Sequence, residues 1–287
     1  MNNYFSFKKY SLNLRGRLFE IEQPLVMGII NSTPDSFYGA SRSMDSRAIA
    51  AVAKHMKAEG ADILDLGACS TRPGAEVVDE QEEIRRLEVA VKAVRETVGS
   101  DMILSVDTFR ASVARRCVEE LGVDIINDIS GGDMDADMNR TVAQLQVPYV
   151  VMHMRGTPAT MQQLTDYNGD VAAEVLESLA KKIDNLHQMG VNDVIADPGF
   201  GFAKTIEQNY RLMSCLEAFH SLNVPLLVGI SRKSMIQKPL NCTANEALNG
   251  TTVLNTVALM CGAHILRVHD VKAAVEARTL VSLTRNQ

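Results

Sequence analysis

Several features are scarce in this chain of 287 residues. Tryptophan is absent, and no apolar run approaches the roughly 18 residues that a membrane-spanning helix needs. The first residues carry Lys8, Lys9, Arg15 and Arg17 among polar positions, and no apolar segment with a cleavage site follows them. Positive charge is not in excess, because 29 Lys and Arg face 35 Asp and Glu. We therefore expect a soluble, cytoplasmic protein that binds neither nucleic acid nor membrane.

Cysteine is also sparse, and its spacing is uninformative for metal binding. The chain has five cysteines and no C-x-x-C pair. Reduced thiols are therefore expected. A hydrophobic content of 46% and a charged content of 22% are typical of folded globular proteins and exclude a disordered chain.

Short runs of apolar and β-branched residues are abundant in the sequence. They read as nearly continuous apolar segments, which is typical of parallel strands that helices cover on both faces of a sheet. There are eight such runs, at residues 26–30, 63–66, 103–106, 124–126, 147–152, 194–196, 225–230 and 264–268. The pattern predicts a parallel α/β sheet of eight strands.

Segments with helical apolar spacing lie between these runs, at residues 46–59, 80–97, 111–121 and 171–189, and a closing helix is expected at 271–283. Eight β-α units in about 260 residues match a (β/α)₈ TIM barrel, whereas a doubly wound sheet, the alternative, usually needs fewer strands. We expect one domain over residues 1–287, with an N-terminal flap at about 1–24. The long polar connections 31–45 and 67–79 are candidate lids.

Polar residues follow the predicted strands. In a barrel the carboxyl ends of the strands meet at one mouth, so these residues are site candidates. They are Asn31, Asp65, Asp107, Asn127, His153, Asp197, Ser231, Arg232, Lys233, Arg267, His269 and Asp270. Any one of them could instead cap a helix or bond a loop. A dense ring of this kind is more typical of a binding site.

The ring has two chemical halves. Asp107, Asn127 and Asp197 offer acceptors and an amide that suit a flat heterocycle with several N–H donors. The residues after the last two strands, Arg232, Lys233, Arg267 and His269, supply a cationic end, where barrels often bind phosphate. We expect a ligand that combines a planar ring with an anion.

Two loop segments are less specific. Asn31 could supply an amide oxygen to Mg²⁺, an ion that usually keeps several waters and takes further oxygens from substrate phosphate. The alternative is that Asn31 and Asp35 only form turns around Pro34. Residues 70–74 place two hydroxyls and a guanidinium beside a Pro-Gly turn, and could equally be a structural turn.

Eight motifs carry a resemblance to a known family. They are MGIINSTPDSF at 27–37, DLGACSTRPGA at 65–75, SVDT at 105–108, INDIS at 126–130, MHMRG at 152–156, DPGFGF at 197–202, GISRKS at 229–234 and RVHDV at 267–271. In this order the chain resembles the dihydropteroate synthase family. The resemblance implies a (β/α)₈ barrel, a transferase of folate biosynthesis, Mg²⁺ as cofactor and a homodimer. The implied reaction joins 6-hydroxymethyl-7,8-dihydropterin diphosphate to p-aminobenzoate and releases pyrophosphate.

The same resemblance implies residue roles. Pterin binding falls to Asp107, Asn127, Ile129, Met152, Asp197, Phe202, Gly229 and Lys233. Diphosphate binding falls to Asn31, Arg72, Arg267 and His269, with Asn31 also the ligand of Mg²⁺. The aminobenzoate side comprises Thr71, Arg72, Pro73, Phe202 and Ser234. The implied catalytic residues are Asp107, Asp197, Lys233, Arg267 and His269.

The sequence departs from the family pattern in two loops. Residues 36–41 lack an acidic residue that many relatives carry, and Cys69 stands where many have Glu. The alternatives are a pterin-dependent methyltransferase, which has no use for an anion cluster, and a catalytically silent pterin-binding paralogue. Leu254, Val257 and Met260 are apolar positions that fit either the core or a dimer interface.

Overall fold

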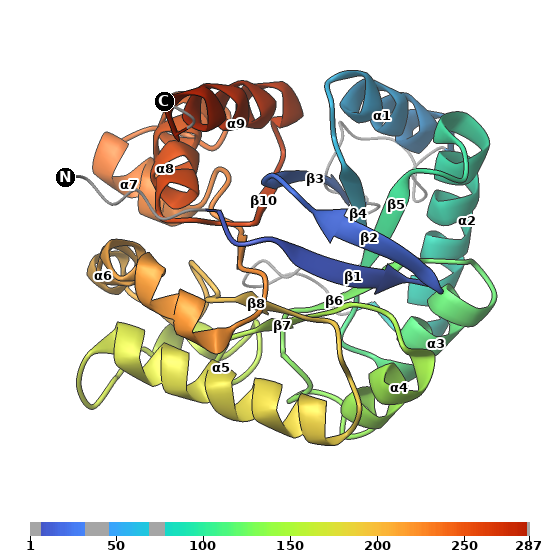
Figure 1. Ribbon diagram of the computed structural model, residues 1–287, viewed down its shortest axis with the longest axis horizontal. Helices are drawn as coiled ribbons and strands as arrows, with labels where there is room; N and C mark the ends of the chain where they lie inside the picture. Colours follow the sequence, from blue (N-terminus) through green and yellow to red (C-terminus); the bar gives the residue numbers. More distant parts are fainter. Residues whose placement is uncertain (1–6, 32–45, 69–77, 286–287) are drawn as a thin grey trace.

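The computed structural model describes residues 7–31, 46–68 and 78–285, and its centre is a barrel of eight parallel strands surrounded by helices (Figure 1). The strands are β3 (Leu25–Asn31), β4 (Ile63–Gly67), β5 (Ile103–Asp107), β6 (Ile125–Asp128), β7 (Tyr149–Met152), β8 (Val194–Asp197), β9 (Leu227–Val228) and β10 (Ile265–Val268). They pair in the order β8-β7-β6-β5-β4-β3-β10-β9, and a parallel bridge between Ala196 and Leu226 closes the circle. The predicted TIM barrel is confirmed.

Helices follow the strands and cover the outside of the barrel. They are α1 (Ser46–Ala58), α2 (Glu80–Val98), α3 (Ala111–Glu119), α4 (Met138–Leu145), α5 (Val171–Gln188), α6 (Ile206–Ser214), α7 (Ser234–Leu240), α8 (Leu248–Met260) and α9 (Val271–Arg285). The five helices expected from apolar spacing end within two residues of their predicted bounds. In the part of the chain that the structure describes, no helix is long and apolar enough to span a membrane.

Two strands are shorter by two or more residues than the apolar runs that predicted them. The run 147–152 pairs only from Tyr149, and the run 225–230 pairs with β10 only at Leu227 and Val228. Pro148 and Pro225 precede these strands, and a proline has no N–H to donate to the ladder. The carbonyl oxygens of both prolines still accept, from Ile126 N and Ala196 N.

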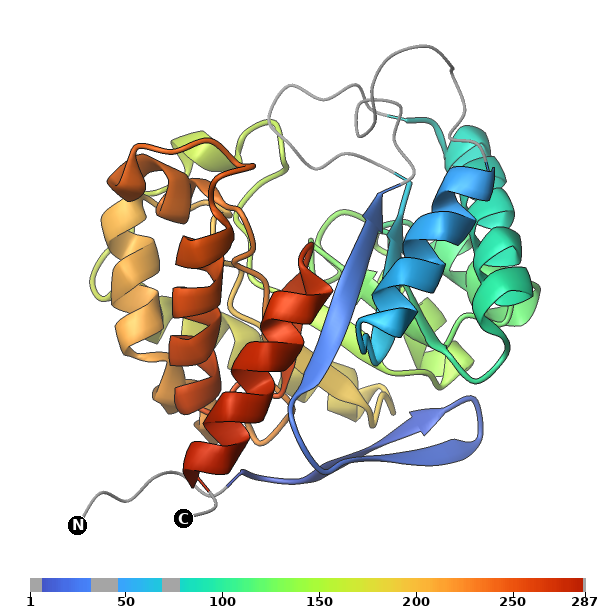
Figure 2. The same cartoon turned by 90° about the horizontal axis from the view of Figure 1, so that it is seen from above.

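An antiparallel hairpin occupies the region where the flap was expected. It consists of β1 (Tyr10–Leu14) and β2 (Arg17–Ile21), joined by Arg15 and Gly16, which have φ angles of 52° and 84°. Two positive φ angles are typical of the tight turn that fits the twist of a hairpin. Figure 2 shows the hairpin lying across the end of the barrel at which β3 begins.

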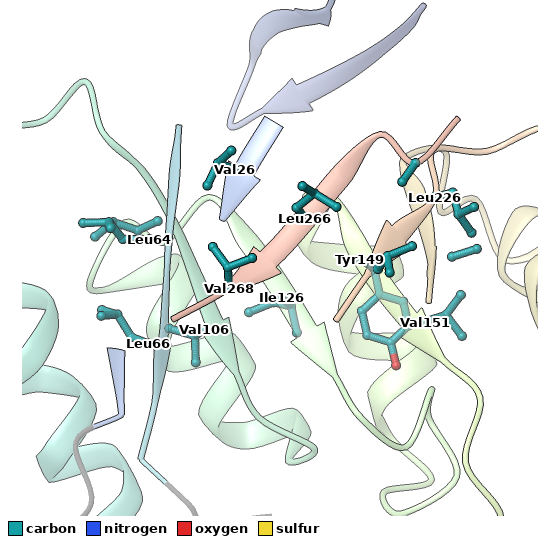
Figure 3. Packing of buried hydrophobic residues seen from close by; sticks show 14 of the residues in the cluster. Val26, Leu64, Leu66, Val106, Ile126, Tyr149, Val151, Leu226, Leu266 and Val268 are labelled. Carbon is teal, nitrogen blue, oxygen red and sulfur yellow. The ribbon is translucent and has the colours of Figure 1, made fainter. Parts of the chain in front are cut away.

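The inner and outer faces of the strands have different partners, because successive side chains in a strand point to opposite sides. Outward residues pack against the helices in the main core, which Figure 3 shows around Leu64, Val106, Ile126 and Leu266. Inward residues near the strand starts form a second apolar cluster that includes Ile63, Ile103, Ile125, Ile195, Ile265 and the hairpin residues Leu12, Leu14 and Ile21. The hairpin therefore completes the apolar floor of the barrel.

Candidate active site

The inward face of the barrel changes from apolar to polar along each strand. Two residues after the floor residues Ile63, Ile125, Ile195 and Ile265 come Asp65, Asn127, Asp197 and Arg267. On β5 the inward sequence is Ile103, Ser105 and Asp107. Because the side-chain period is two, all these polar groups face the same interior, above the floor. The mouth predicted from strand ends is therefore built from alternate residues of the strands themselves.

Arg267 ties three strands together inside the barrel. Its Nε donates to Asp65 Oδ2 at 2.7 Å, and its Nη2 donates to Asp107 Oδ2 at 2.9 Å. Asn127 Nδ2 donates to the same Asp65 oxygen at 3.1 Å. Among the described residues, the second oxygen of the fully buried Asp65 has no hydrogen-bond partner. Among the described residues, Arg267 uses two of its five N–H groups on these two carboxylates.

Three side chains surround the backbone of Gly229, the residue directly after β9. The backbone of Gly229 lies so that a methyl group on its Cα would be 3.9 Å from Asp197 Oδ2, 4.0 Å from Lys233 Nζ and 3.8 Å from Arg267 Cβ. These are ordinary contact distances, and no side chain of residue 229 occupies that position. At Gly229 there is therefore room for a methyl group in ordinary contact with one carboxylate and two basic side chains.

An apolar surface that includes Phe202 lies next to Lys233, and we call it the apolar wall. Lys233 Nζ lies 4.6 Å from the centre of the Phe202 ring and donates to Phe200 O at 2.5 Å. Phe202 packs on a separate apolar cluster formed by Ile129, Met152, Met154, Met161 and Ala203. Methionine thioethers are polarizable and adapt to flat rings. The structure thus brings together three expected pterin residues, Ile129, Met152 and Phe202, on one wall.

The rim of the mouth holds His269 and Ser234, both exposed. His269 Nδ1 lies 3.0 Å from Ser231 Oγ, and the His269 N–H donates to the same hydroxyl at 3.2 Å. Arg232, which the sequence placed in the cationic half, is bound elsewhere: its Nε and Nη2 donate to both oxygens of Asp270. The basic residues of the mouth are therefore Lys233, Arg267 and His269.

Asn31 ends β3 beside Asp107. A methyl group on Gly67, which lies between them on β4, would be 3.4 Å from Asn31 Oδ1 and 3.7 Å from Asp107 Cβ. Within the described ranges, no three His, Cys, Asp or Glu side chains gather to hold a metal ion. A neutral amide oxygen fits Mg²⁺, because this ion takes most of its ligands from water and substrate phosphate.

Burial shifts the titration of the charged groups in the mouth. It raises the pKa of Asp107 to about 7, although the positive charge of Arg267 opposes this change. It also raises the pKa of Asp197, against the opposing effect of Lys233. Burial lowers the pKa of Lys233 to about 8, and Asp197 counteracts it. The mouth therefore holds groups that titrate near neutral pH, as functional sites often do.

Some expected site residues lie outside the described residues. These are Thr71, Arg72 and Pro73, together with Cys69 and most of both candidate lids.

The structure also gives partners to residues that the sequence left without a role. Asp65, Ser231 and His153 were strand-end candidates with no assigned function, although Asp65 stands at the same inward position on β4 as Asn127 does on β6. Lys204 was not a candidate at all, and its Nζ lies 3.0 Å from His153 Nδ1 in the interior. No spacing pointed to this lysine.

Known proteins match almost the whole of this chain. The family described as "Pterin binding enzyme" matches residues 27–269. Dihydropteroate synthase of Escherichia coli (strain K12) is 40% identical over 279 residues, which cover 94% of this chain and 95% of the relative. The solved Yersinia pestis dihydropteroate synthase, in a complex with a sulfonamide drug, superposes with a TM-score of 0.90 at 37% identity and covers 97% of this chain and 100% of its own.

The solved Xanthomonas albilineans dihydropteroate synthase, with 4-aminobenzoic acid, gives a TM-score of 0.88 at 35% identity and covers 96% of this chain and 98% of its own. These matches confirm the family, the fold and the transferase activity that the eight motifs predicted. The chain therefore belongs to the pterin binding enzyme family and, within it, to the dihydropteroate synthases.

Proposed function

We propose that this chain condenses 6-hydroxymethyl-7,8-dihydropterin diphosphate with p-aminobenzoate, giving 7,8-dihydropteroate and pyrophosphate. The residues of the mouth bind both substrates and stabilise the charges that form. The observation that carries these assignments is the position of Asp197, Lys233 and Arg267 around the backbone of Gly229, together with the apolar cluster on which Phe202 packs. A glycine lets a flat ring approach the backbone closely, and the charged groups around it suit a polar heterocycle. Family membership and the aminobenzoate complex of the Xanthomonas relative support the reaction.

The pterin ring binds beside the backbone of Gly229. Asp107, Asn127 and Asp197 hydrogen-bond to its edge, because a reduced pterin presents several N–H donors and one lactam oxygen. Ile129, Met152 and Phe202 contact its flat face. A ring that lacks these donors would leave buried carboxylates unpaired, so the same contacts give specificity.

The diphosphate lies across the mouth, toward Asn31, His269 and the guanidinium group of Arg267. Asn31 would hold Mg²⁺ through its side-chain oxygen, and the ion would supply positive charge to the leaving pyrophosphate. Ser231 orients the His269 ring through its hydroxyl.

The reaction begins when the bond between the pterin methylene carbon and the diphosphate oxygen breaks, with its electron pair leaving on oxygen. The positive charge that forms is shared by the reduced pterin ring, and Asp107 and Asp197 stabilise it. The amine of p-aminobenzoate then forms the new C–N bond and loses one proton. Phe202 and Ser234 contact the aminobenzoate, and the family resemblance assigns the same role to Thr71, Arg72 and Pro73, which lie outside the described residues. No side-chain nucleophile is needed.

The helices on one side of the barrel carry the surface for a homodimer. Val253 of α8 is 53% exposed and Leu280 of α9 is 65% exposed, and the two helices lie side by side (Figure 2). Val257 is exposed as well, whereas Leu254 and Met260 pack partly against the core. Dimerisation would cover these apolar side chains. Val253→Asp should therefore convert a dimer to a monomer in analytical ultracentrifugation, and an unchanged mass would contradict this interface.

We place the protein in the cytoplasm. Three of its cysteines, Cys117, Cys215 and Cys242, have free thiols in the structure. Free thiols fit a reducing compartment.

The reaction is tested by measuring pyrophosphate release with both substrates and with each omitted in turn. We expect release that requires both. Pterin binding without turnover would identify a silent paralogue instead.

The pterin assignment is tested with Gly229→Ala. The added methyl meets ordinary contact distances, so the variant should fold, but it occupies the pterin space and should weaken binding of 6-hydroxymethylpterin about tenfold or more. Gly169→Ala is the matched control, because a Cβ at Gly169 meets no atom within 4 Å. Equal affinities of the two variants would place the pterin elsewhere.

A further inference from the structure

A buried lysine that none of the proposed steps uses lies directly behind the mouth. Lys204 is 4% exposed, and its Nζ lies 2.9 Å from Gly199 O, 3.0 Å from Phe202 O and 3.0 Å from His153 Nδ1. An ammonium group has three donors and no acceptor, so these three partners use its full capacity. Burial lowers the pKa of Lys204 to about 7, and the charge of Asp197 opposes this change. Burying a cation is costly unless each donor is satisfied, so these three contacts help the side chain to keep its charge.

Two of the three partners of Lys204 are backbone carbonyls of one turn. Residues 199–202 form the turn that follows β8, and side chains from other parts of the chain bind much of its backbone. Lys204 binds the carbonyls of Gly199 and Phe202, Lys233 binds that of Phe200, and Asn209 Oδ1 accepts from Gly201 N at 2.6 Å. The turn is therefore held by side chains beneath it.

This turn connects to three groups that face the pterin. Asp197 Oδ1 accepts from Gly199 N at 2.8 Å, so the turn fixes the orientation of that carboxylate. Phe202 belongs to the turn, and Lys233 is attached to it through Phe200 O. A displacement of the turn would move all three together.

His153 completes the arrangement from the neighbouring strand. It directly follows Met152 of β7, and its N–H donates to Asp197 O at 3.0 Å. Its Nδ1 must be unprotonated to accept from the Lys204 ammonium. Burial and the charge of Lys204 lower the pKa of His153 to about 2, so the ring stays neutral. Gly199 has a φ of 71°, and a Cβ there would lie 2.0 Å from His153 O, so only glycine allows the turn to pack this closely.

We propose that Lys204 and His153 are positioning residues that hold the 199–202 turn in the shape that binds the pterin ring. This inference rests on the proposed function and extends it to two residues outside the mouth. They act through Asp197, Phe202 and Lys233, and they take no part in binding the diphosphate.

The test compares affinities for two probes, 6-hydroxymethylpterin and Mg²⁺-pyrophosphate, by isothermal titration calorimetry. Lys204→Met keeps the aliphatic length of the side chain and removes its three donors. His153→Leu removes the acceptor, whereas His153→Asn keeps an acceptor close to the Nδ1 position. Lys57→Met is the matched control, because Lys57 also donates to a carbonyl, Val98 O, away from the turn.

We expect the pterin Kd of Lys204→Met and of His153→Leu to rise about tenfold or more, as when a residue supporting a binding side chain is lost. Pyrophosphate affinity should not change, because its proposed partners are not attached to the turn. His153→Asn and Lys57→Met should bind pterin like the wild type. A purely structural role would weaken both probes together, and that outcome would overturn the proposal.

Unchanged pterin affinity in a folded Lys204→Met would also overturn it. If Lys204→Met does not fold, the comparison of His153→Leu with His153→Asn tests the proposal. Equal pterin affinities of these two variants would refute it. Failure of the wild type to bind the pterin probe would instead refute the proposed function, and the positioning role with it.

Discussion

Acid should destabilise this protein through one histidine at the barrel floor. His264 is fully buried immediately before β10, and its Nδ1 accepts from Leu226 N at 3.0 Å. Its Nε2 lies 3.1 Å from Lys8 O, so the ring also fastens the segment before the hairpin. A proton on Nδ1 would remove the bond from Leu226. Burial, assisted by the charge of His220, lowers the pKa of His264 from 6.5 to about 4.

The size of the effect follows from this pKa. Between pH 6.5 and about 4 the unfolded chain binds a proton at His264 that the folded chain does not, so stability falls as the pH falls through this range. The full difference corresponds to about 3 kcal/mol, at roughly 1.36 kcal/mol per pKa unit. About 2 kcal/mol of it is lost between pH 7 and pH 5.

The measurement is urea unfolding of the wild type and of His264→Asn at pH 7 and pH 5, with reversibility checked by refolding. Asparagine keeps an acceptor near the Nδ1 position and does not titrate. His153 also has a lowered pKa, but it is present in both proteins and cancels in the comparison. The wild type should lose about 2 kcal/mol more than the variant between the two pH values. Equal losses would refute the reasoning.

Three further predictions concern the mouth and the floor. Asp107→Asn and Asp197→Asn should each lower turnover by roughly two to three orders of magnitude with unchanged circular dichroism, and near-wild-type kcat in both would remove them from the site. Turnover should stop in excess chelator and return with Mg²⁺, so full activity in the chelator would contradict the role of Asn31. Ile21→Ala should cost about 2–5 kcal/mol of unfolding free energy, because Ile21 is fully buried in the floor, and an unchanged urea midpoint would contradict that packing.

Much of the barrel could be predicted from the sequence because its strands are buried on both faces. Runs such as 63–66 and 103–106 contain few polar residues, and short runs of this kind that alternate with helical segments are typical of parallel sheets. The hairpin was not predicted as two strands. The second strand, RLFEI, mixes charged and apolar residues, so its apolar pattern in the sequence is weak. In the structure Leu18 is 69% exposed, so not even all of its apolar residues are buried. The Arg15-Gly16 turn was the available clue.

The candidate site was predictable where one strand ends in one polar residue. The partners of a side chain could not be predicted where several oppositely charged residues follow neighbouring strands. Arg232 and Arg267 both follow late strands, yet Arg232 binds Asp270 at the rim while Arg267 points inward to Asp65 and Asp107. The difference comes from strand register and backbone conformation, since Arg232 lies beyond its strand with a φ of 56°. Lys204 was missed because it lies in the irregular segment between β8 and α6, where no hydrophobic periodicity marks a residue as buried.

The place of β10 in the sheet determines when this barrel can form during synthesis. β10 pairs with β3 on one side and with β9 on the other, so the first and the last quarter of the chain must meet to close the circle. Until residues 265–268 have left the ribosome, β3 has an unpaired edge, and such edges favour aggregation. We therefore expect a chain that stops before residue 265 to leave the sheet open between β3 and β9, so that loss of β10 removes a strand of the barrel as well as Arg267.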